Sequence, residues 1–276
     1  MSAGRLGGRR LLVTLGGLAV LGFSLFPVVI MLSTAFDARA NDGSRALLPS
    51  DWTLDNFRFV LDEGRFTTYL TNSLLVALST VVASGLLALL ASVAVSRFTF
   101  RFRTSLLVMV LVVQMVPLEA LVIPLFIQAK TLGMLNHLFG LVVVYVAFSL
   151  PFAIWTLRGF VAAIPRELEE AAYVDGASWP RMFWSILMPL CAPGLVATSV
   201  FSFITAWNEF VFAITFLNDQ DSYTVAAGLR QFFTQYGTDW GAVMAGSTLI
   251  TIPVMLFFVA VQRKLSAGLV SGAVKG

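Results

Sequence analysis

Few residues of this 276-residue chain could carry out chemistry. His137 is the single histidine and Cys191 the single cysteine, so the sequence offers neither a His/Cys metal cluster nor an internal disulfide. No lysine follows a glycine, which excludes a P-loop for ATP phosphates. An intramembrane hydrolase would need a base beside a nucleophile, and no Gly-x-Ser-x-Gly segment accompanies His137. We therefore expect no catalytic residue and no metal or cofactor bound by this chain.

The remaining chemical candidates are polar side chains inside long apolar segments: Gln114, Glu119, Asn208 and Glu209. A polar group in lipid is costly, so it marks either a functional position or a hydrogen bond to a neighbouring helix. For Glu119, beside Pro117, we favour a structural or gating role at the outer end of its segment. For Asn208 and Glu209 both interpretations stay open.

The elements that must position these groups are membrane helices. Hydrophobic residues make up 58% of the chain and charged residues 12%, which leaves more apolar surface than a soluble chain of this size can bury. Six segments are long and apolar enough to span a bilayer: 11–36, one within 66–96, 104–128, 138–157, 192–217 and 241–262. We predict an all-α integral membrane protein with six transmembrane helices. The first segment exceeds the apolar part of a signal peptide, so we expect an uncleaved helix.

The basic residues predict the orientation. Most of the 18 fall on the side that carries both termini: Arg5, Arg9, Arg10, Arg97, Arg101, Arg103, Arg158, Arg166, Arg181, Arg263, Lys264 and Lys275. Because cytoplasmic loops collect Lys and Arg, both termini are predicted to be cytoplasmic, with longer outer loops at 37–65 and 218–240. The basic residues form short islands between apolar runs, which favours membrane contact over nucleic-acid binding.

The inner segment 158–190, between the fourth and fifth spans, carries the most specific pattern. Pro165 and the glutamates at 167, 169 and 170 are typical of a helix start, and Gly176 of a helix end. Ser178 can cap a second helix that has Trp179 and Pro180 in its first turn. We predict two short helices joined by a tight turn at Asp175-Gly176. From this pattern alone, an amphipathic connector at the membrane surface is the simpler interpretation.

The spacing within this segment resembles the EAA loop of ABC importer permeases. Glu170-Ala171-Ala172, three residues, Gly176, nine residues, Ile186, one residue and Met188-Pro189 match that pattern at every position except Met188, where the family has Leu. The segment Trp207 to Phe210 and the Gly-rich ending 267–276 resemble the carbohydrate branch, specifically the maltose-transporter-type second permease. The resemblance covers essentially the whole chain.

The resemblance implies a set of ATPase-coupling residues in a short cytoplasmic helix that docks into a groove of a partner ATPase: Glu170, Ala171, Ala172, Asp175, Gly176, Ala177, Ser178 and Trp179. For Glu167 and Glu169 we favour a solvated helix face. It also implies that the tail reaches between the ATPase subunits through Ser271, Gly272, Ala273, Val274, Lys275 and Gly276. A frayed terminus is the equal alternative for that tail.

The same resemblance divides the chain into domains, and the polar and aromatic residues within the spans supply candidates for the translocation path. Residues 1–65 would form the first helix and outer loop, 66–262 a five-helix permease core with the EAA loop at 158–190, and 263–276 the cytoplasmic tail. Candidates for the translocation path are Trp207, Asn208, Glu209, Gln114 and Glu119, where a carboxylate could accept sugar hydroxyls and an aromatic ring could stack on a sugar. An aromatic residue at helical spacing, however, more often belongs to the core or faces lipid.

The function implied is that of one permease of a binding-protein-dependent ABC importer for a sugar or oligosaccharide, in the inner membrane of a prokaryote. Its partners would be a second, non-identical permease, two ATPase subunits that carry ATP and Mg²⁺, an external solute-binding protein and membrane lipid, but no nucleic acid. The alternatives are an ABC permease for a non-sugar solute and an ion-coupled secondary transporter. The latter predicts an internal repeat, and no convincing repeat is present.

Overall fold

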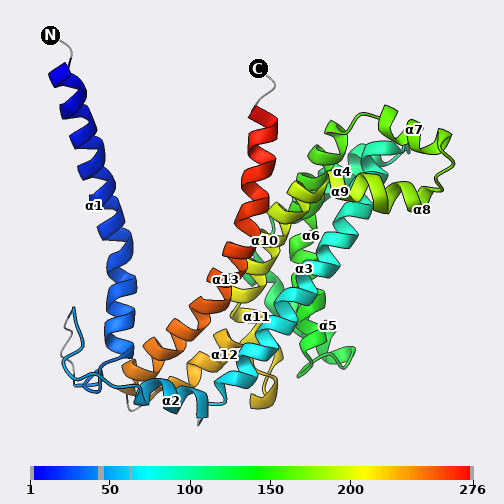
Figure 1. Ribbon diagram of the computed structural model, residues 1–276. Coiled ribbons are helices and arrows are strands. Elements are labelled where there is room, and N and C mark those ends of the chain that lie inside the picture. The colour runs from blue at the N-terminus through cyan, green and yellow to red at the C-terminus, as the bar shows by residue number, and fades with distance from the viewer. Residues whose placement is uncertain (1–2, 43–46, 63, 236, 274–276) are drawn as a thin grey trace. The chain divides into compact units, whose positions relative to one another are not determined.

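The computed structural model describes residues 3–42, 47–62, 64–235 and 237–273 (Figure 1). The chain divides into two compact units, residues 1–67 with 229–252 and residues 68–228 with 253–276. Four helical segments are each long and apolar enough to cross a membrane: Leu12–Ala35, Phe66–Arg97, Leu138–Ala163 and Trp240–Gln262. They lie in the helices α1 (Ala3–Ala35), α3 (Phe66–Arg97), α6 (Leu138–Ala163) and α13 (Trp240–Ala273). Two bent helix pairs raise the number of spans to six if each pair is one span.

The predicted third span is broken. Helix α4 (Arg103–Val113) is followed by the 3-10 turn η1 (Leu118–Leu121) and α5 (Val122–Thr131), and the two halves are bent by 96°. Pro117 accounts for the break, because it has no N–H to continue a helix and disfavours helical geometry in the residue before it. Pro124, by contrast, lies in the first turn of α5, where the missing N–H costs little.

The predicted fifth span also departs from one straight helix. Helix α10 (Ala192–Asn208) ends at Glu209, whose backbone is extended, and the short α11 (Val211–Phe216) follows. No proline lies at this break. Pro151 does not interrupt its helix, since α6 runs through that residue without a break.

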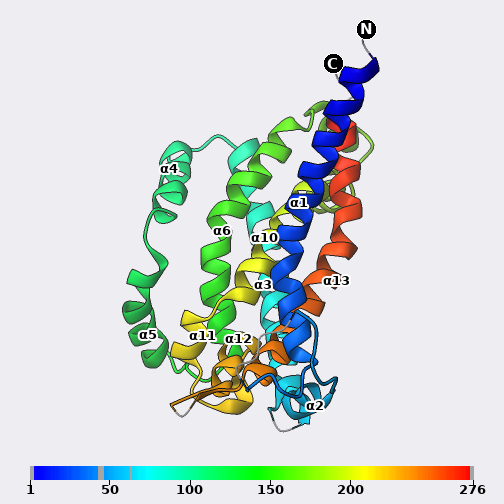
Figure 2. The same ribbon diagram turned by 90° about the vertical axis from the view of Figure 1, so that its left-hand side faces the viewer.

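Small residues let the long helices of the second unit pack closely. Along α3, the residues Ser73, Ala77, Thr80, Ser84, Ala88 and Ser92 form a buried stripe. The Ser92 hydroxyl donates to the Ile154 carbonyl oxygen of α6 at 3.1 Å, and the Ser84 hydroxyl lies 3.2 Å from that of Ser202 in α10. Small side chains and interhelical hydrogen bonds of this kind stabilise helix contacts where lipid removes the hydrophobic drive. Helices α3, α6 and α10 accordingly run side by side in Figures 1 and 2.

Helix α10 approaches α6 closely at Gly194. A Cβ atom added there would lie 2.5 Å from Cδ2 of Phe160 and 3.1 Å from Cδ2 of Leu157, which is closer than side chains pack. Farther along α10, Phe203 stacks on Trp207 and on Phe257 of α13, with ring centroids 5.4 and 4.0 Å apart. Phe203 and Trp207 are both buried.

The segments predicted to be outer loops contain short elements instead of plain loops. In the first unit these are α2 (Asp55–Asp62), the 3-10 turn η4 (Arg230–Phe232) and the hairpin of β1 (Phe233–Thr234) and β2 (Gly237–Thr238). In the second unit they are η3 (Gln220–Ser222) and most of α12 (Val225–Leu229). The Asn72 side chain of α3 donates to the carbonyl oxygens of Asp221 and Tyr223, which ties this outer segment to a long helix.

Asp37 organises the chain after α1. Its carboxylate accepts hydrogen bonds from the backbone amides of Ser50, Arg39 and Asp51 and from the Ser50 hydroxyl. These donors, the Ser50 and Arg39 amides foremost, lower the pKa of Asp37 to about 2. An isolated antiparallel bridge pairs Asp37 with Trp52, so the segment after α1 and the segment before α2 lie side by side at these residues.

Candidate functional site

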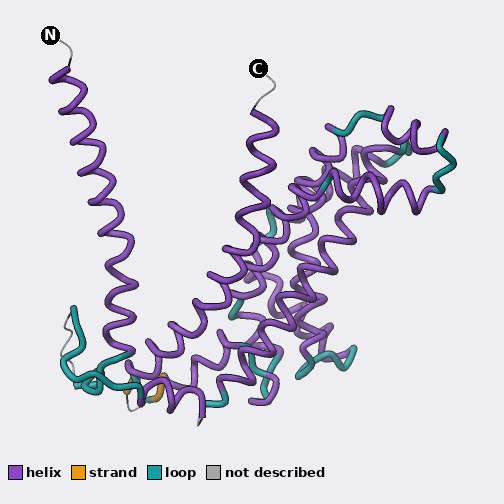
Figure 3. Tube along the Cα trace, in the orientation of Figure 1, coloured by secondary structure: helices purple, strands orange, loops and turns teal. Residues whose placement is uncertain are grey.

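The EAA-like segment folds as two helices joined by a tight turn, as predicted. Helix α7 (Glu167–Val174) follows Pro165, and α8 (Trp179–Met182) has Trp179 and Pro180 in its first turn. The chain continues through a π-helical turn (Phe183–Leu187) and α9 (Met188–Leu190), so the second helical stretch is longer than predicted. The stretch 179–190 is bent by 72° from α10. Figure 3 shows the connection between α7 and α8 as a short loop.

The turn itself is a complete Schellman motif. The Ala177 amide donates to the Ala172 carbonyl at 2.9 Å, and the Gly176 amide to the Tyr173 carbonyl at 3.0 Å. Gly176 has a φ of +79°, a left-handed conformation that costs other residues free energy. Ser178 occupies the N-cap position of α8, but its side chain makes no capping hydrogen bond, so that part of the prediction was wrong.

The predicted coupling residues divide into an outward and an inward set. Ala172 is buried among Met182, Phe183 and Leu187, and Ala177 packs partly against the same cluster. Ala172 therefore contacts the chain itself and does not offer a surface to a partner, whereas Ala177 stays partly exposed. The exposed members are Glu170, Ala171, Asp175, Gly176, Ser178 and Trp179.

Two exposed apolar residues extend this surface beyond the sequence prediction. Val174 is 88% exposed and Tyr173 is 46% exposed, and both lie in the last turn of α7 beside the Gly176 turn. The cue was present in the sequence: two large apolar residues directly precede the helix-ending Asp175-Gly176 pair. Exposed apolar residues flanked by carboxylates form the kind of patch that proteins use for contact.

Glu169 is not solvated, contrary to our expectation. Its Oε1 lies 2.6 Å from Nε of Arg97, the last residue of α3, and only 12% and 10% of the two side chains are exposed. The Arg97 guanidinium also donates to the carbonyl oxygen of Ile164, just before α7, at 2.9 Å. Arg97 thus joins the end of α3 to Glu169 of α7 and to Ile164, the C-cap residue of α6. Glu167, on the same helix, is exposed, as expected.

Glu209 occupies the break between α10 and α11. Its carboxylate accepts the backbone amides of Phe212 at 2.9 Å and Ala213 at 3.1 Å, two of the free N–H groups in the first turn of α11. The Tyr145 hydroxyl of α6 donates to the same carboxylate at 2.5 Å. A negative charge at a helix N-terminus is favourable, so this geometry gives Glu209 a structural task.

The remaining path candidates do not gather at one place. Asn208 is exposed beside Glu209, whereas Trp207 is buried in the stack with Phe203. Gln114 and Glu119 are exposed at the two sides of the break between α4 and α5. His137 is the N-cap residue of α6 and is also exposed.

Comparison with known proteins identifies the family. Residues 84–270 match the family model described as "Binding-protein-dependent transport system inner membrane component". The chain belongs to this family. It is a multi-pass inner-membrane permease of a binding-protein-dependent ABC importer, and this excludes the ion-coupled transporter and the hydrolase as alternatives.

Relatives of the permease cover nearly its whole length. It is 42% identical over 254 residues to the diacetylchitobiose uptake system permease protein DasC of Streptomyces coelicolor, covering 91% of this chain and 92% of the relative. It is 36% identical to the trehalose transport system permease protein SugB of Mycobacterium tuberculosis, covering 93% and 94%. It is 35% identical to the trehalose/maltose transport system permease protein MalG of Thermococcus litoralis, covering 97% and 98%.

A solved structure supports the same fold. A chain from the crystal structure of a bacterial ABC transporter involved in the import of the acidic polysaccharide alginate matches with a TM-score of 0.80 and 22% identity, covering 95% of this permease and 98% of that chain. At this identity the likeness concerns the fold alone. The permease therefore has the overall fold of that transporter chain.

Only some of the tail residues predicted to contact the ATPase are among the residues that the structure describes. Helix α13 includes Ser271, Gly272 and Ala273, of which the backbone alone is described, whereas Val274, Lys275 and Gly276 lie outside the described residues. The tail contact stays a prediction.

Proposed function

We propose that this permease forms, with a second and non-identical permease, the membrane pathway for a sugar or oligosaccharide. A solute-binding protein delivers the sugar from outside, and two ATPase subunits that hold ATP and Mg²⁺ drive the cycle. In this proposal the chain has six spans, and each bent pair, Arg103–Val113 with Leu118–Thr131 and Trp179–Leu190 with Ala192–Asn208, counts as one of them. The basic residues favour the cytoplasm for the side that carries both termini. The names of three relatives support a sugar, since these proteins are named for diacetylchitobiose, trehalose and trehalose/maltose transport.

The observation that carries the coupling role is the exposed corner between α7 and α8. It presents Tyr173, Val174 and Trp179 together with the carboxylates of Glu170 and Asp175. Among the described residues, neither carboxylate has an ion-pair partner. A partner groove with apolar walls and a basic rim would complement this corner, and the Schellman turn fixes its shape before docking.

In this proposal Arg97 transmits movement of this corner to the membrane helices. Movement of α7 is transmitted to α3 because Arg97 holds Glu169 and the Ile164 carbonyl at once. Ala172, packed in the core cluster, gives the same helix an apolar second attachment. In this proposal the exposed face receives the motion of the ATPase and the buried face passes it on.

Co-purification and transport test the proposal together. Purification of the tagged permease from its native membrane in mild detergent should recover a P-loop ATPase and a second multi-span permease, identified by mass spectrometry. The binding protein encoded with them would then be screened against a panel of sugars. Asp175→Ala should uncouple ATP hydrolysis from sugar uptake in vesicles, whereas Glu167→Gln should not. Recovery of the permease alone, or uptake of a non-sugar solute only, would contradict the proposal.

A further inference from the structure

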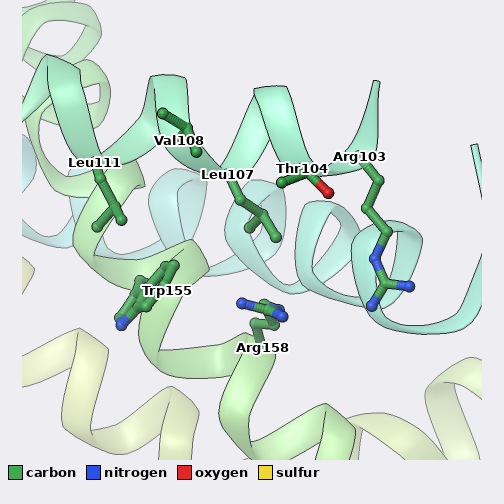
Figure 4. A pocket seen from close by; sticks show the side chains of 7 residues that line it. All are labelled: Arg103, Thr104, Leu107, Val108, Leu111, Trp155 and Arg158. Carbon is green, nitrogen blue, oxygen red and sulfur yellow. The ribbon is translucent and has the colours of Figure 1, made fainter. Parts of the chain in front are cut away.

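The permease has a basic pocket between α4 and α6 that neither the coupling loop nor the path candidates use. It has a volume of about 360 Å³ and is lined by Arg103, Thr104, Leu107, Val108, Leu111, Trp155 and Arg158. Figure 4 shows the side chains of α4 above those of Trp155 and Arg158, which come from α6. All seven residues belong to the second unit.

The polar end of the pocket is positively charged. Arg158 lies over the ring of Trp155, with its Cζ atom 5.5 Å from the ring centroid, and this contact holds the guanidinium in place. Arg103 and Thr104 come from the first turn of α4, whose N-cap residue, Phe102, makes no side-chain capping bond. Among the described residues, neither Arg103 nor Arg158 forms an ion pair. Two guanidinium groups beside an uncapped helix N-terminus favour an anion with several oxygen atoms.

The other wall of the pocket is apolar and follows one face of α4. Leu107 is buried, while Val108 and Leu111 are 53% and 39% exposed and continue the wall toward the middle of the predicted third span. Trp155 is 45% exposed and contacts Arg158, and tryptophan is enriched at the membrane–water interface. A ligand that fits must therefore combine an anionic head with an acyl chain.

The predicted membrane boundary coincides with the two arginines. By the sequence boundaries Arg103 directly precedes the third span, 104–128, and Arg158 directly follows the fourth, 138–157. In the structure Arg103 begins α4 and Arg158 lies in the last two turns of α6, both near the predicted cytoplasmic side. At that depth a guanidinium meets the phosphate groups of the inner leaflet, and basic pockets between helices on this side suit anionic lipids. We propose that the α4–α6 pocket binds an anionic phospholipid of the inner leaflet, its phosphate between Arg103 and Arg158 and an acyl chain along Leu107 and Leu111.

This proposal depends on the proposed orientation of the permease, but it can be tested without transport. The purified complex would be exchanged into detergent with dioleoyl phosphatidylglycerol or dioleoyl phosphatidylcholine, and retained lipid counted by native mass spectrometry. The phosphatidylglycerol should be retained over the phosphatidylcholine. Arg158→Gln should lose about fivefold in retention, the effect of one basic residue near an anionic surface. Arg103→Gln is the second variant if Arg158→Gln fails to assemble.

Arg101→Gln is the matched control, because Arg101 is exposed on the same predicted side and does not line the pocket. Equal retention in Arg158→Gln and Arg101→Gln would overturn the proposal, as would equal binding of the two lipids. Displacement of the lipid by inorganic phosphate would assign the pocket to a soluble anion instead. A cross-link from Val108→Cys to the second permease would assign it to a protein contact. Because the readout is lipid bound to the complex, its failure would leave the import function standing.

Discussion

Replacing Arg97 by glutamine should loosen the coupling helix α7 from α3 without unfolding the permease. The change removes the 2.6 Å contact to Glu169 and leaves that carboxylate with 12% of its side chain exposed. A hydrogen bond to a charged group contributes about 1.5–3 kcal/mol, and breaking a fully buried pair costs about 3–5 kcal/mol. Since both side chains keep some solvent contact, we expect about 2–3 kcal/mol, or a shift of roughly 30- to 150-fold in the docking equilibrium of α7.

Hydrogen exchange of the α7 amides measures this shift directly. In Arg97→Gln, the amides of α7 should exchange faster by up to that factor, while those of α3 and α6 should change little. In vesicles, the amount of sugar transported per ATP hydrolysed should fall. Glu167→Gln is the control, since it removes one carboxylate from the same helix at an exposed position. The double variant Arg97→Glu/Glu169→Arg should recover part of both properties. Unchanged α7 exchange in Arg97→Gln and in Glu169→Gln would refute the reasoning.

Three further predictions concern other parts of the permease. Glu209→Gln and Tyr145→Phe should each lower the melting temperature and leave the KM for sugar unchanged, because the Glu209 carboxylate caps α11; a large rise in KM with normal stability would instead make Glu209 a path residue. Because the pKa of Asp37 is lowered to about 2, its contribution to stability is complete above about pH 4 and is lost as pH falls toward 2. Pepsin should therefore cut residues 38–50 increasingly over that range in the wild type, whereas Asp37→Asn should be cut as fast at pH 4 as at pH 2. Gly194→Ala should destabilise the α6–α10 contact by about 1–3 kcal/mol, whereas Gly159→Ala, which meets no atom within 4 Å, should not; equal melting temperatures would contradict the close approach.

The parts of the fold that depend on local chemistry could be predicted from the sequence. Pro165, the three glutamates after it and Gly176 each act within a few residues, and together they placed α7, its left-handed end and the start of α8. The long apolar runs likewise predicted α1, α3, α6 and α13, because the length and composition of a spanning helix are properties of its own residues. Pro117 accounts for the break in the third span by the same local chemistry, but a proline alone does not determine the angle of 96°.

The parts that depend on distant residues could not be predicted. Glu169 pairs with Arg97, which lies 72 residues earlier in the sequence. No periodicity in α7 distinguishes Glu169 from the exposed Glu167. The break at Glu209 has no proline and is held by Tyr145, 64 residues earlier. The burial of Ala172 likewise depends on Met182 and Phe183 folding back after the turn. These contacts determine which side of the coupling helix faces a partner.

Site-specific cross-linking at Val174 tests the central claim most directly. Val174 is 88% exposed at the tip of α7, and the single native cysteine, Cys191, is buried, so Val174→Cys gives one reactive thiol. In the purified complex, a short bifunctional reagent should join this thiol to the P-loop ATPase, with a yield that changes when ATP is added. Leu132→Cys, 71% exposed on the predicted outer side, should give no such product. Cross-linking of Leu132→Cys but not Val174→Cys to the ATPase would contradict the account.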